Sequence, residues 1–190
     1  MQNPVEIEDL RVRRTRTTLQ RALIELTVEK GFAAVTVRDI CERAMVNRST
    51  FYRHYIDKYD LLDQYAAEVG KLTTPALSEN DGLHTGPLQL LKHVQQFADF
   101  YRVMLGQNGD PLFTQRFREN IAERFRYLLS LQDAPTAPNT PPLEMRLNYI
   151  ASAVVGAILW WLENDQPGMP EQMGIWLRQL NSAALGARPT

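Results

Sequence analysis

Apolar residues recur at helical spacing along most of the chain. The first such run predicts the buried face of a helix from Val12 to Glu29 and consists of Leu19, Ala22, Leu23 and Leu26. Gly31 then ends this helix. Because the same spacing continues almost to the end of the chain and strands are not indicated anywhere, the pattern predicts an all-α protein with about nine helices.

Three further helix starts follow within a short stretch. After an extended link over residues 32 to 35, Thr36 is predicted to cap a helix, and Asp39, three residues later, completes a capping box. The next helix begins with Asn47 as its cap, and another opens at Asp57. Short helices joined by tight turns have the geometry of a helix-turn-helix.

The helix predicted from Arg48 to Tyr55 has an unusual composition for a purely structural element. Phe51 and Tyr55 lie four residues apart on one face and are expected to anchor it. Its other face carries groups that hydrogen-bond to base edges and phosphates, namely Arg48, Ser49, Thr50, Tyr52 and His54. A recognition helix enters the major groove by its N-terminal residues, so this pattern favours DNA binding.

Charge strengthens this interpretation. The 190 residues have a formal net charge of −1, but residues 10 to 58 carry eleven Lys and Arg against five Asp and Glu, a net charge of +6. Residues 1 to 9 carry −3 and residues 59 to 190 carry −4. Attraction to phosphate is local, so a compact basic module suits a nucleic-acid contact, although basic stretches also occur as ordinary solvated helix faces.

These residues resemble a known family. The stretch from Thr36 to Ile40, then Ala44 to Asn47, Ser49 to Tyr55 and Asp57 to Leu62 is similar to the N-terminal domain of tetracycline-repressor-like (TetR/AcrR) regulators. The resemblance covers about residues 12 to 65. It implies a homodimer with a helix-turn-helix domain, placed at residues 1–60, and a helical dimerisation and ligand-sensing domain, placed at residues 61–190.

The resemblance also implies roles for individual residues. Arg48, Ser49 and Thr50 would face bases, and Arg48 is the candidate for a bidentate contact with guanine. The residues expected on backbone phosphates are Tyr52, His54 and Lys58, with Thr36 and Arg38 at the start of the preceding helix. The expected partners are a palindromic double-stranded operator, a second copy of the chain and a small-molecule effector.

Several residues have a second interpretation. Tyr52 could pack against the first helix instead of contacting phosphate, and His54 could cap a helix or pair locally. Cys41 lies on an apolar helix face, which favours a small core residue over a redox sensor. Met45 stands where the family usually has Gly, so the turn is either strained or uses other backbone angles.

The N-terminal basic residues leave two interpretations open. They form a run that could be an arm reaching along DNA or a disordered leader with solvated charge, and they are Arg11, Arg13, Arg14 and Arg16.

The remainder of the chain is predicted to be helical and aromatic. Loops are expected at residues 73 to 87, 134 to 142 and 164 to 170, where Gly, Pro and polar residues gather. A helical repeat covers residues 90 to 105, and Asp110 with Pro111 opens another helix. The large apolar residues are either core or the lining of a ligand pocket, in which case the lining is Phe97, Phe100, Tyr101, Met104, Phe117, Ile121, Phe125 and Trp160.

The last two predicted helices suggest an interface. Residues 143 to 163 are apolar on nearly all sides, and Ser152 and Gly156 place small residues four apart, which permits close helix approach. In the family these two helices pair with their symmetry mates in a four-helix bundle. The corresponding candidates here are Val155, Leu159, Leu162, Trp176, Leu177 and Leu180.

Other function classes lack a signal. The sequence has no phosphate-binding Gly loop and no metal-ligand spacing, so we expect no enzyme activity, no cofactor and no metal. With no apolar leader in the first 25 residues and no span of about 20 apolar residues, we expect a cytoplasmic protein without membrane contact. The predicted function is a homodimeric repressor released from its operator by a small apolar or amphipathic ligand. Activation is possible, and the alternative is a helical adaptor or coactivator that works through a partner protein.

Overall fold

The computed structural model describes residues 10–73, 82–107, 109–130 and 140–181. In these ranges it contains nine α-helices, one short 3₁₀ helix and no strand, which agrees with the predicted all-α class. The chain divides into two compact units, Met1–Ala66 and Ala67–Thr190. The sequence predicted the boundary between residues 60 and 61, which lies in the same helix, Lys58–Thr73, as the boundary between the two units.

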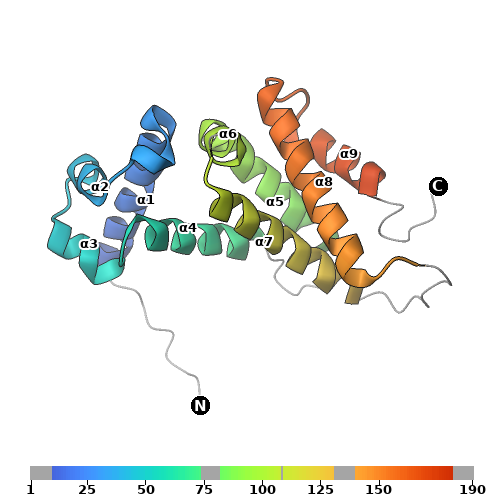
Figure 1. The fold of residues 1–190 in the computed structure, drawn as a ribbon, viewed down its shortest axis with the longest axis horizontal. Coiled ribbons are helices and arrows are strands. Elements are labelled where there is room, and N and C mark those ends of the chain that lie inside the picture. Colours follow the sequence, from blue (N-terminus) through green and yellow to red (C-terminus); the bar gives the residue numbers. More distant parts are fainter. Residues whose placement is uncertain (1–9, 74–81, 108, 131–139, 182–190) are drawn as a thin grey trace, which may run out of the picture. The chain divides into compact units, whose positions relative to one another are not determined.

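The first unit is a small helical domain (Figure 1). It contains α1 (Leu10–Lys30), the 3₁₀ helix η1 (Phe32–Ala34), α2 (Val37–Ala44), α3 (Arg48–His54) and the start of α4 (Lys58–Thr73). Helix α1 packs against η1 and α2, and α2 packs against α3. The fully buried side chains here come from all four α-helices and include Leu19, Leu23, Ile40, Phe51 and Leu61. Most of them occupy the apolar positions at helical spacing in the sequence.

Local signals explain most helix starts in this unit. Thr36 and Asp39 form the predicted capping box of α2: the Asp39 N–H donates to Thr36 Oγ1 at 3.2 Å, and the Thr36 N–H donates to Asp39 Oδ2 at 2.8 Å. Asp57 Oδ1 accepts from the N–H groups of Tyr59 and Asp60 at the start of α4. Asn47 occupies the N-cap position of α3 but makes no side-chain cap bond, so the predicted capping role of this side chain is wrong.

Two other predictions for this unit need correction. The link between the first two helices is not wholly extended, because Phe32–Ala34 forms a 3₁₀ turn after Gly31, whose φ of 77° suits glycine. The basic run that begins at Arg11 is not a disordered leader, because all four arginines lie within α1, and its reach along DNA stays a prediction. In this helix Thr15 and Thr18 also bond back to the carbonyls of Arg11 and Arg14.

The second unit is a bundle of the remaining helices (Figure 1). These are α5 (Gly82–Gln96), α6 (Ala98–Leu105), α7 (Pro111–Ser130), α8 (Leu143–Glu163) and α9 (Pro170–Asn181). Helix α8 packs against α6, α7 and α9, and α5 packs against α6 and α9.

Helix α8 is the central apolar element of this unit. By length and composition it could cross a membrane, but its buried positions lie in the core of the bundle. They are Leu147, Ile150, Ala151, Val154, Val155, Ile158, Trp161 and Leu162. The helix therefore fits the predicted interpretation of a buried core helix.

Two predicted boundaries in this unit differ from the structure. Residues Gly82–Pro87 belong to α5 and not to a loop, since Pro87 lies inside the helix. The repeat over residues 90 to 105 is interrupted at Phe97, whose φ of −116° and ψ of 39° leave the helical region. The predicted cap at Asp110 is present, because Asp110 Oδ1 accepts from the Phe113 N–H at 2.8 Å. Most of the loop predicted at residues 134 to 142 lies outside the described residues.

Ionic and polar contacts join neighbouring helices of the bundle. Arg102 of α6 donates from Nε and Nη2 to the Leu162 carbonyl near the end of α8, at 3.1 and 3.0 Å. Arg126 of α7 makes a bidentate pair with Glu144 in the first turn of α8, at 2.6 and 2.8 Å. The fork geometry of arginine suits both contacts, so α8 is held at each end.

Candidate functional site

Helix α3 is oriented by its two predicted anchors. Phe51 and Tyr55 are 0% and 2% exposed, with ring centroids 5.6 Å apart. Because these side chains hold one face of the helix in the core, the opposite face turns outward. Arg48, Ser49 and Tyr52 are exposed, whereas Thr50 and His54 are half-buried.

Arg48 and Tyr52 interact with each other on this outward face. Arg48 Nη2 lies 3.5 Å from Tyr52 Oη, and the guanidinium carbon lies 5.9 Å from the centre of the ring. Tyr52 is 52% exposed, so it is not packed into the core, although its ring makes an edge contact with Phe51 at 5.5 Å. The hydrogen bond to Tyr52 also raises the pKa of Arg48. Together the two residues present a cation and a phenol hydroxyl at the surface.

The start of α2 is fixed by charge as well as by its cap. Lys30 Nζ donates to Asp39 Oδ2 at 2.7 Å, and the Thr36 hydroxyl donates to the same oxygen at 2.7 Å. These contacts, that of Lys30 first, hold the pKa of Asp39 well below its usual range. Thr36 therefore uses its hydroxyl in the cap, and its predicted contact with phosphate stays a prediction.

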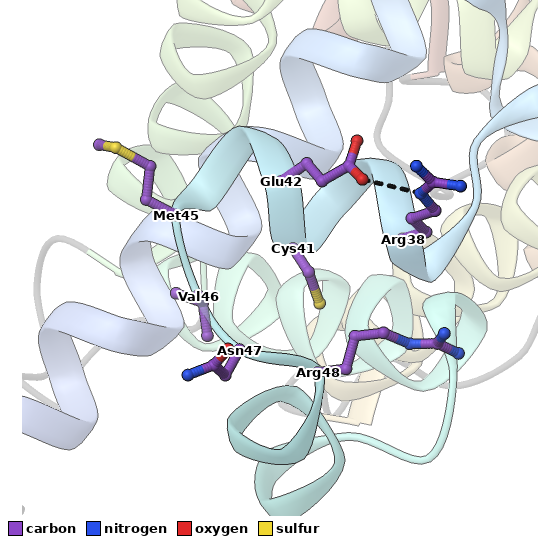
Figure 2. A pocket seen from close by; sticks show the side chains of 7 residues that line it. All are labelled: Arg38, Cys41, Glu42, Met45, Val46, Asn47 and Arg48. Atoms are coloured by element: carbon purple, nitrogen blue, oxygen red, sulfur yellow. Dashed lines mark hydrogen bonds and ion pairs between the residues drawn. The ribbon is translucent and has the colours of Figure 1, made fainter.

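A surface hollow of about 520 Å³ lies between α2 and the start of α3 (Figure 2). Arg38 extends from α2 and Arg48 from α3 toward the same side of this hollow in the view of Figure 2. Arg38 Nε donates to Glu42 Oε1 at 2.7 Å. The remaining lining residues are Cys41, Met45, Val46 and Asn47. The hollow thus combines apolar side chains with two arginines, a carboxylate and an amide, and its arginines are suited to contact a nucleic acid.

Cys41 is 4% exposed, in line with its predicted place in the core. Burial raises the pKa of its thiol. A buried thiol with a raised pKa holds little thiolate, so its chemistry does not favour redox sensing.

Lys58 is held in a way that the sequence did not reveal. Its ammonium donates to the carbonyl oxygens of Phe32, Ala33 and Val35, at 2.9, 3.1 and 2.8 Å. It also lies 4.7 Å from the centre of the Phe32 ring. Since an ammonium has three N–H donors, a contact with phosphate requires one of these bonds to be exchanged. The predicted phosphate contact of Lys58 stays a prediction, and its role within the fold is to join α4 to η1.

Met45 adopts the left-handed conformation that the family usually gives to Gly. Its φ is 53° and its ψ is 42°, and its side chain is 93% exposed. Of the two alternatives raised by the sequence, the structure therefore contains the strained turn. The Met45 N–H still closes α2 by bonds to the carbonyls of Cys41 and Glu42.

The residues predicted to line a ligand pocket fall into three groups. Phe100, Tyr101, Met104, Phe117 and Ile121 are buried, Phe97 and Phe125 are half-buried, and Trp160 is 51% exposed. The buried rings contact one another, since Tyr101 lies 5.5 Å from Phe100 and 5.6 Å from Phe117. Phe100, Tyr101 and Phe117 thus form one aromatic cluster of α6 and α7, and Trp160 is exposed on α8.

Two further residues contact this aromatic cluster, and sequence reasoning did not identify them as site residues. Phe113 stacks on Phe117 with centroids 6.0 Å apart, and His93 lies 3.1 Å from the Tyr101 hydroxyl through Nδ1. Burial lowers the pKa of His93 to about 4. The spacing of His93 and Tyr101, about two helical turns, could have indicated that they lie on one side. The sequence did not indicate the break at Phe97 that separates them.

The predicted interface residues are also divided by burial. Leu162 is 0% exposed and Val155 is 7% exposed within the protomer, so their side chains are not available to a partner, which corrects their predicted role. Leu159, Trp176 and Leu177 are half-buried, and Leu180 is 73% exposed. The exposed residues of α8 include Met145, Tyr149, Ser152, Ala153, Gly156 and Trp160, together with the polar Asn148.

Comparison with known proteins matches both units. The model described as bacterial regulatory proteins of the tetR family matches residues 20–65, and the model described as transcriptional regulator C-terminal region matches residues 81–181. An uncharacterised HTH-type transcriptional regulator, YxbF of Bacillus subtilis (strain 168), is 26% identical in an alignment of 171 residues that covers 83% of this chain. The chain spans only 43% of the length of that relative.

Solved structures show the same fold. A TetR transcriptional regulator from Streptococcus agalactiae 2603V has a TM-score of 0.68 and 24% identity, over 92% of this chain and 97% of that one. FadR of Thermus thermophilus, described as a TetR-family repressor in complex with lauroyl-CoA, has a TM-score of 0.55 and 21% identity, over 92% and 97% of the two chains. Because the C-terminal model alone matches more than half of the 190 residues and the N-terminal model matches the helices with the polar outward face, the chain belongs to the tetR family of transcriptional regulators.

Proposed function

We propose that the protein is a homodimeric repressor that binds a palindromic DNA operator. The observation that carries this proposal is the outward face of α3, where Arg48, Ser49 and Tyr52 are exposed while Phe51 and Tyr55 hold the helix in the core. Such a face can enter a major groove without disturbing the packing beneath it. We assign DNA binding to residues 1–60, and dimerisation and ligand sensing to residues 61–190.

Within this proposal the residues divide into two kinds of contact. Arg48 is the base reader, since a guanidinium can bond to two acceptors of guanine at once, and Ser49 and Thr50 accompany it at the start of α3. Tyr52, His54, Lys58 and Thr36 contribute to the hold on backbone phosphate, which gives affinity on any sequence. Repression is chosen over activation as the default of the family.

Dimerisation is assigned to the outward face of α8 with the end of α9. Ser152, Ala153 and Gly156 are small and exposed, and a Cβ built on Gly156 meets no atom within 4 Å. Exposed apolar residues flank them, with Tyr149 63% and Trp160 51% exposed. A contiguous apolar face with small residues at its centre favours a close helix–helix contact with a symmetry mate.

A small apolar or amphipathic ligand is proposed to release the operator. The aromatic cluster of α6 and α7, with its polar His93–Tyr101 pair, is the region we assign to it. A ligand can act only through unequal affinity for the DNA-bound and free forms. As a regulator that acts on DNA, the protein is proposed to work in the cytoplasm.

The alternative is a helical adaptor or coactivator that acts through a partner protein. One protein of similar fold is described as the activator of a dihydroxyacetone kinase operon, DhaS, with a TM-score of 0.70 and 17% identity. That degree of likeness concerns the fold alone. The exposed arginine and hydroxyl groups of α3 favour DNA as the partner of this unit.

The test is selection of bound duplexes from a random DNA library, followed by fluorescence anisotropy at two salt concentrations. We expect a palindromic consensus, and binding that weakens with salt because phosphate contacts release counterions. Arg48→Ala should relax preference at one base pair by about tenfold, and Tyr52→Ala should weaken binding to all duplexes. Glu119→Ala, on the exposed face of α7, is the matched control. A library with no enriched sequence and binding no stronger than to unrelated DNA would favour the adaptor.

A further inference from the structure

Each arginine beside the hollow of Figure 2 is bonded to the residue four positions later on its own helix. Arg38 donates to Glu42 at 2.7 Å on α2, and Arg48 donates to Tyr52 at 3.5 Å on α3. Both arginines line the same hollow. A carboxylate, Glu42, is therefore part of a surface that is otherwise suited to a polyanion.

We propose that Glu42 is a positioning residue that orients Arg38 toward a base edge and so raises the sequence discrimination of the protein. The inference rests on the proposed DNA-binding function and deepens it, because it gives Arg38 a base contact in place of the phosphate contact that the resemblance implies. Its basis is the shared hollow, which brings Arg38 next to the start of α3 and the base reader Arg48.

The atoms used in the Arg38–Glu42 contact explain the orientation. The bond is made by Nε, and among the described residues no other side-chain hydrogen bond of Arg38 is found. Nη1 and Nη2 at the end of the fork remain for an incoming ligand. Two parallel donors of this kind match the O6 and N7 acceptors of guanine. Holding a long side chain before binding also reduces the conformational entropy that binding must remove.

The same carboxylate has an unfavourable effect on DNA of any sequence. The side chains of Glu42 and Arg38 are 62% and 75% exposed, so the negative charge of Glu42 stands near the path of the phosphates. Like charges reduce affinity for every duplex alike. Glu42 should therefore weaken binding to DNA of any sequence while it increases the preference for the operator. Removing Glu42 should then lower the Kd for scrambled DNA and also lower the ratio of scrambled to operator Kd.

The experiment compares wild type, Glu42→Ala and Glu42→Gln on two fluorescein-labelled duplexes, one with the selected operator and one with the same bases scrambled. Glu42→Ala removes both charge and acceptor, and we expect tighter binding to the scrambled duplex together with a ratio of scrambled to operator Kd about fivefold lower. Glu42→Gln removes the charge but keeps an acceptor, so it should retain most of the ratio. Glu119→Ala controls for the loss of one negative charge elsewhere.

The Arg38→Ala background isolates the mechanism. There, Glu42→Ala should leave the Kd ratio unchanged, because the side chain that Glu42 orients is gone. The inference is overturned if Glu42→Ala tightens binding to both duplexes equally, or if Glu42→Gln and Glu42→Ala lower the ratio alike. If wild type itself shows no preference for any duplex, the proposed function fails and this inference fails with it. Both residues are exposed on α2, and thermal unfolding checks that each variant is folded.

Discussion

Met45 occupies the turn between α2 and α3 with positive φ and a side chain that is 93% exposed. For an L-residue the left-handed conformation brings Cβ too close to the following carbonyl oxygen, at a cost of about 1–2 kcal/mol. Nothing in the burial of Met45 offsets this cost. The residue therefore stores strain at the point where α3, the proposed recognition helix, joins the fold.

Replacing Met45 with glycine should stabilise the protein. Met45→Gly removes the strain but adds freedom to the unfolded chain, which leaves a net gain of about 0.5–1 kcal/mol in the free energy of unfolding. Met45→Ala keeps a Cβ and should change the free energy little. Urea unfolding at one fixed protein concentration measures both, and equal values for the glycine and alanine variants would contradict the strain.

The orientation of single residues of the site could be predicted only where helical spacing decides which side of a helix they occupy. The four-residue spacing of Phe51 and Tyr55 predicted the buried side of α3, and hence the exposed side that carries Arg48. The partners of Lys58 could not be predicted, because its carbonyl acceptors lie 23 to 26 residues away in the sequence. Contacts over such separations depend on how helices pack, for which a local pattern has no signal.

At the scale of elements, the first turn of α4 is fastened to η1 by Lys58. Replacing it by Met keeps the length of the side chain but leaves three carbonyls without their charged donor. Lys58→Met should lower the free energy of unfolding by about 2 kcal/mol. Lys92→Met, which removes an exposed ion pair with Glu171, should cost less than about 1 kcal/mol. Chemical denaturation compares the two, and a similar small loss in both would show that the three bonds contribute little.

Helices were predictable where a regular apolar stripe has clear ends. Leu143–Glu163 has the predicted bounds, and the capping residues fixed α2 and α7. The break at Phe97 was not predictable, since the apolar period continues through it from α5 to α6. Gly82–Pro87 shows the opposite case, in which residues typical of loops are helical. Packing against neighbouring helices decides such segments, and propensity is too weak to oppose it.

The pair of His93 and Tyr101 across this break predicts a pH dependence of stability. The folded state keeps His93 neutral down to its pKa of about 4, whereas the unfolded state takes up a proton near the ordinary value of 6.5. Between these pH values His93 binds more protons in the unfolded chain than in the folded chain. His93 therefore lowers the free energy of unfolding as pH falls from 6.5 toward 4. His93→Gln should therefore reduce the loss of stability between about pH 7 and about pH 5. Melting temperatures measure this, with His54→Gln as the control on the other unit, and parallel curves for wild type and His93→Gln would contradict it.

At the scale of the whole molecule, the proposed dimer makes a prediction about Gly156. An added side chain there meets no atom of its own protomer within 4 Å, so Gly156→Arg should not unfold the bundle. At a close helix contact with a partner it would separate the two copies. We expect Gly156→Arg to elute as a monomer in size-exclusion chromatography with light scattering, while Glu119→Arg stays dimeric. If Gly156→Arg is still dimeric, the interface does not lie on this face of α8.

The single cysteine, Cys41, allows the opening of the first unit to be followed by the rate of thiol labelling. Cys41 lines the hollow but is only 4% exposed, and the pKa of its thiol is raised by burial. A thiol reagent should therefore label it slowly, and the rate of labelling should increase when the first unit opens locally. Since the second unit contains no cysteine, the reaction reports on the first unit alone, in the intact chain and without an engineered probe. Slower labelling upon addition of an operator would mean that DNA closes this unit, and faster labelling upon addition of an effector would mean that the effector loosens it.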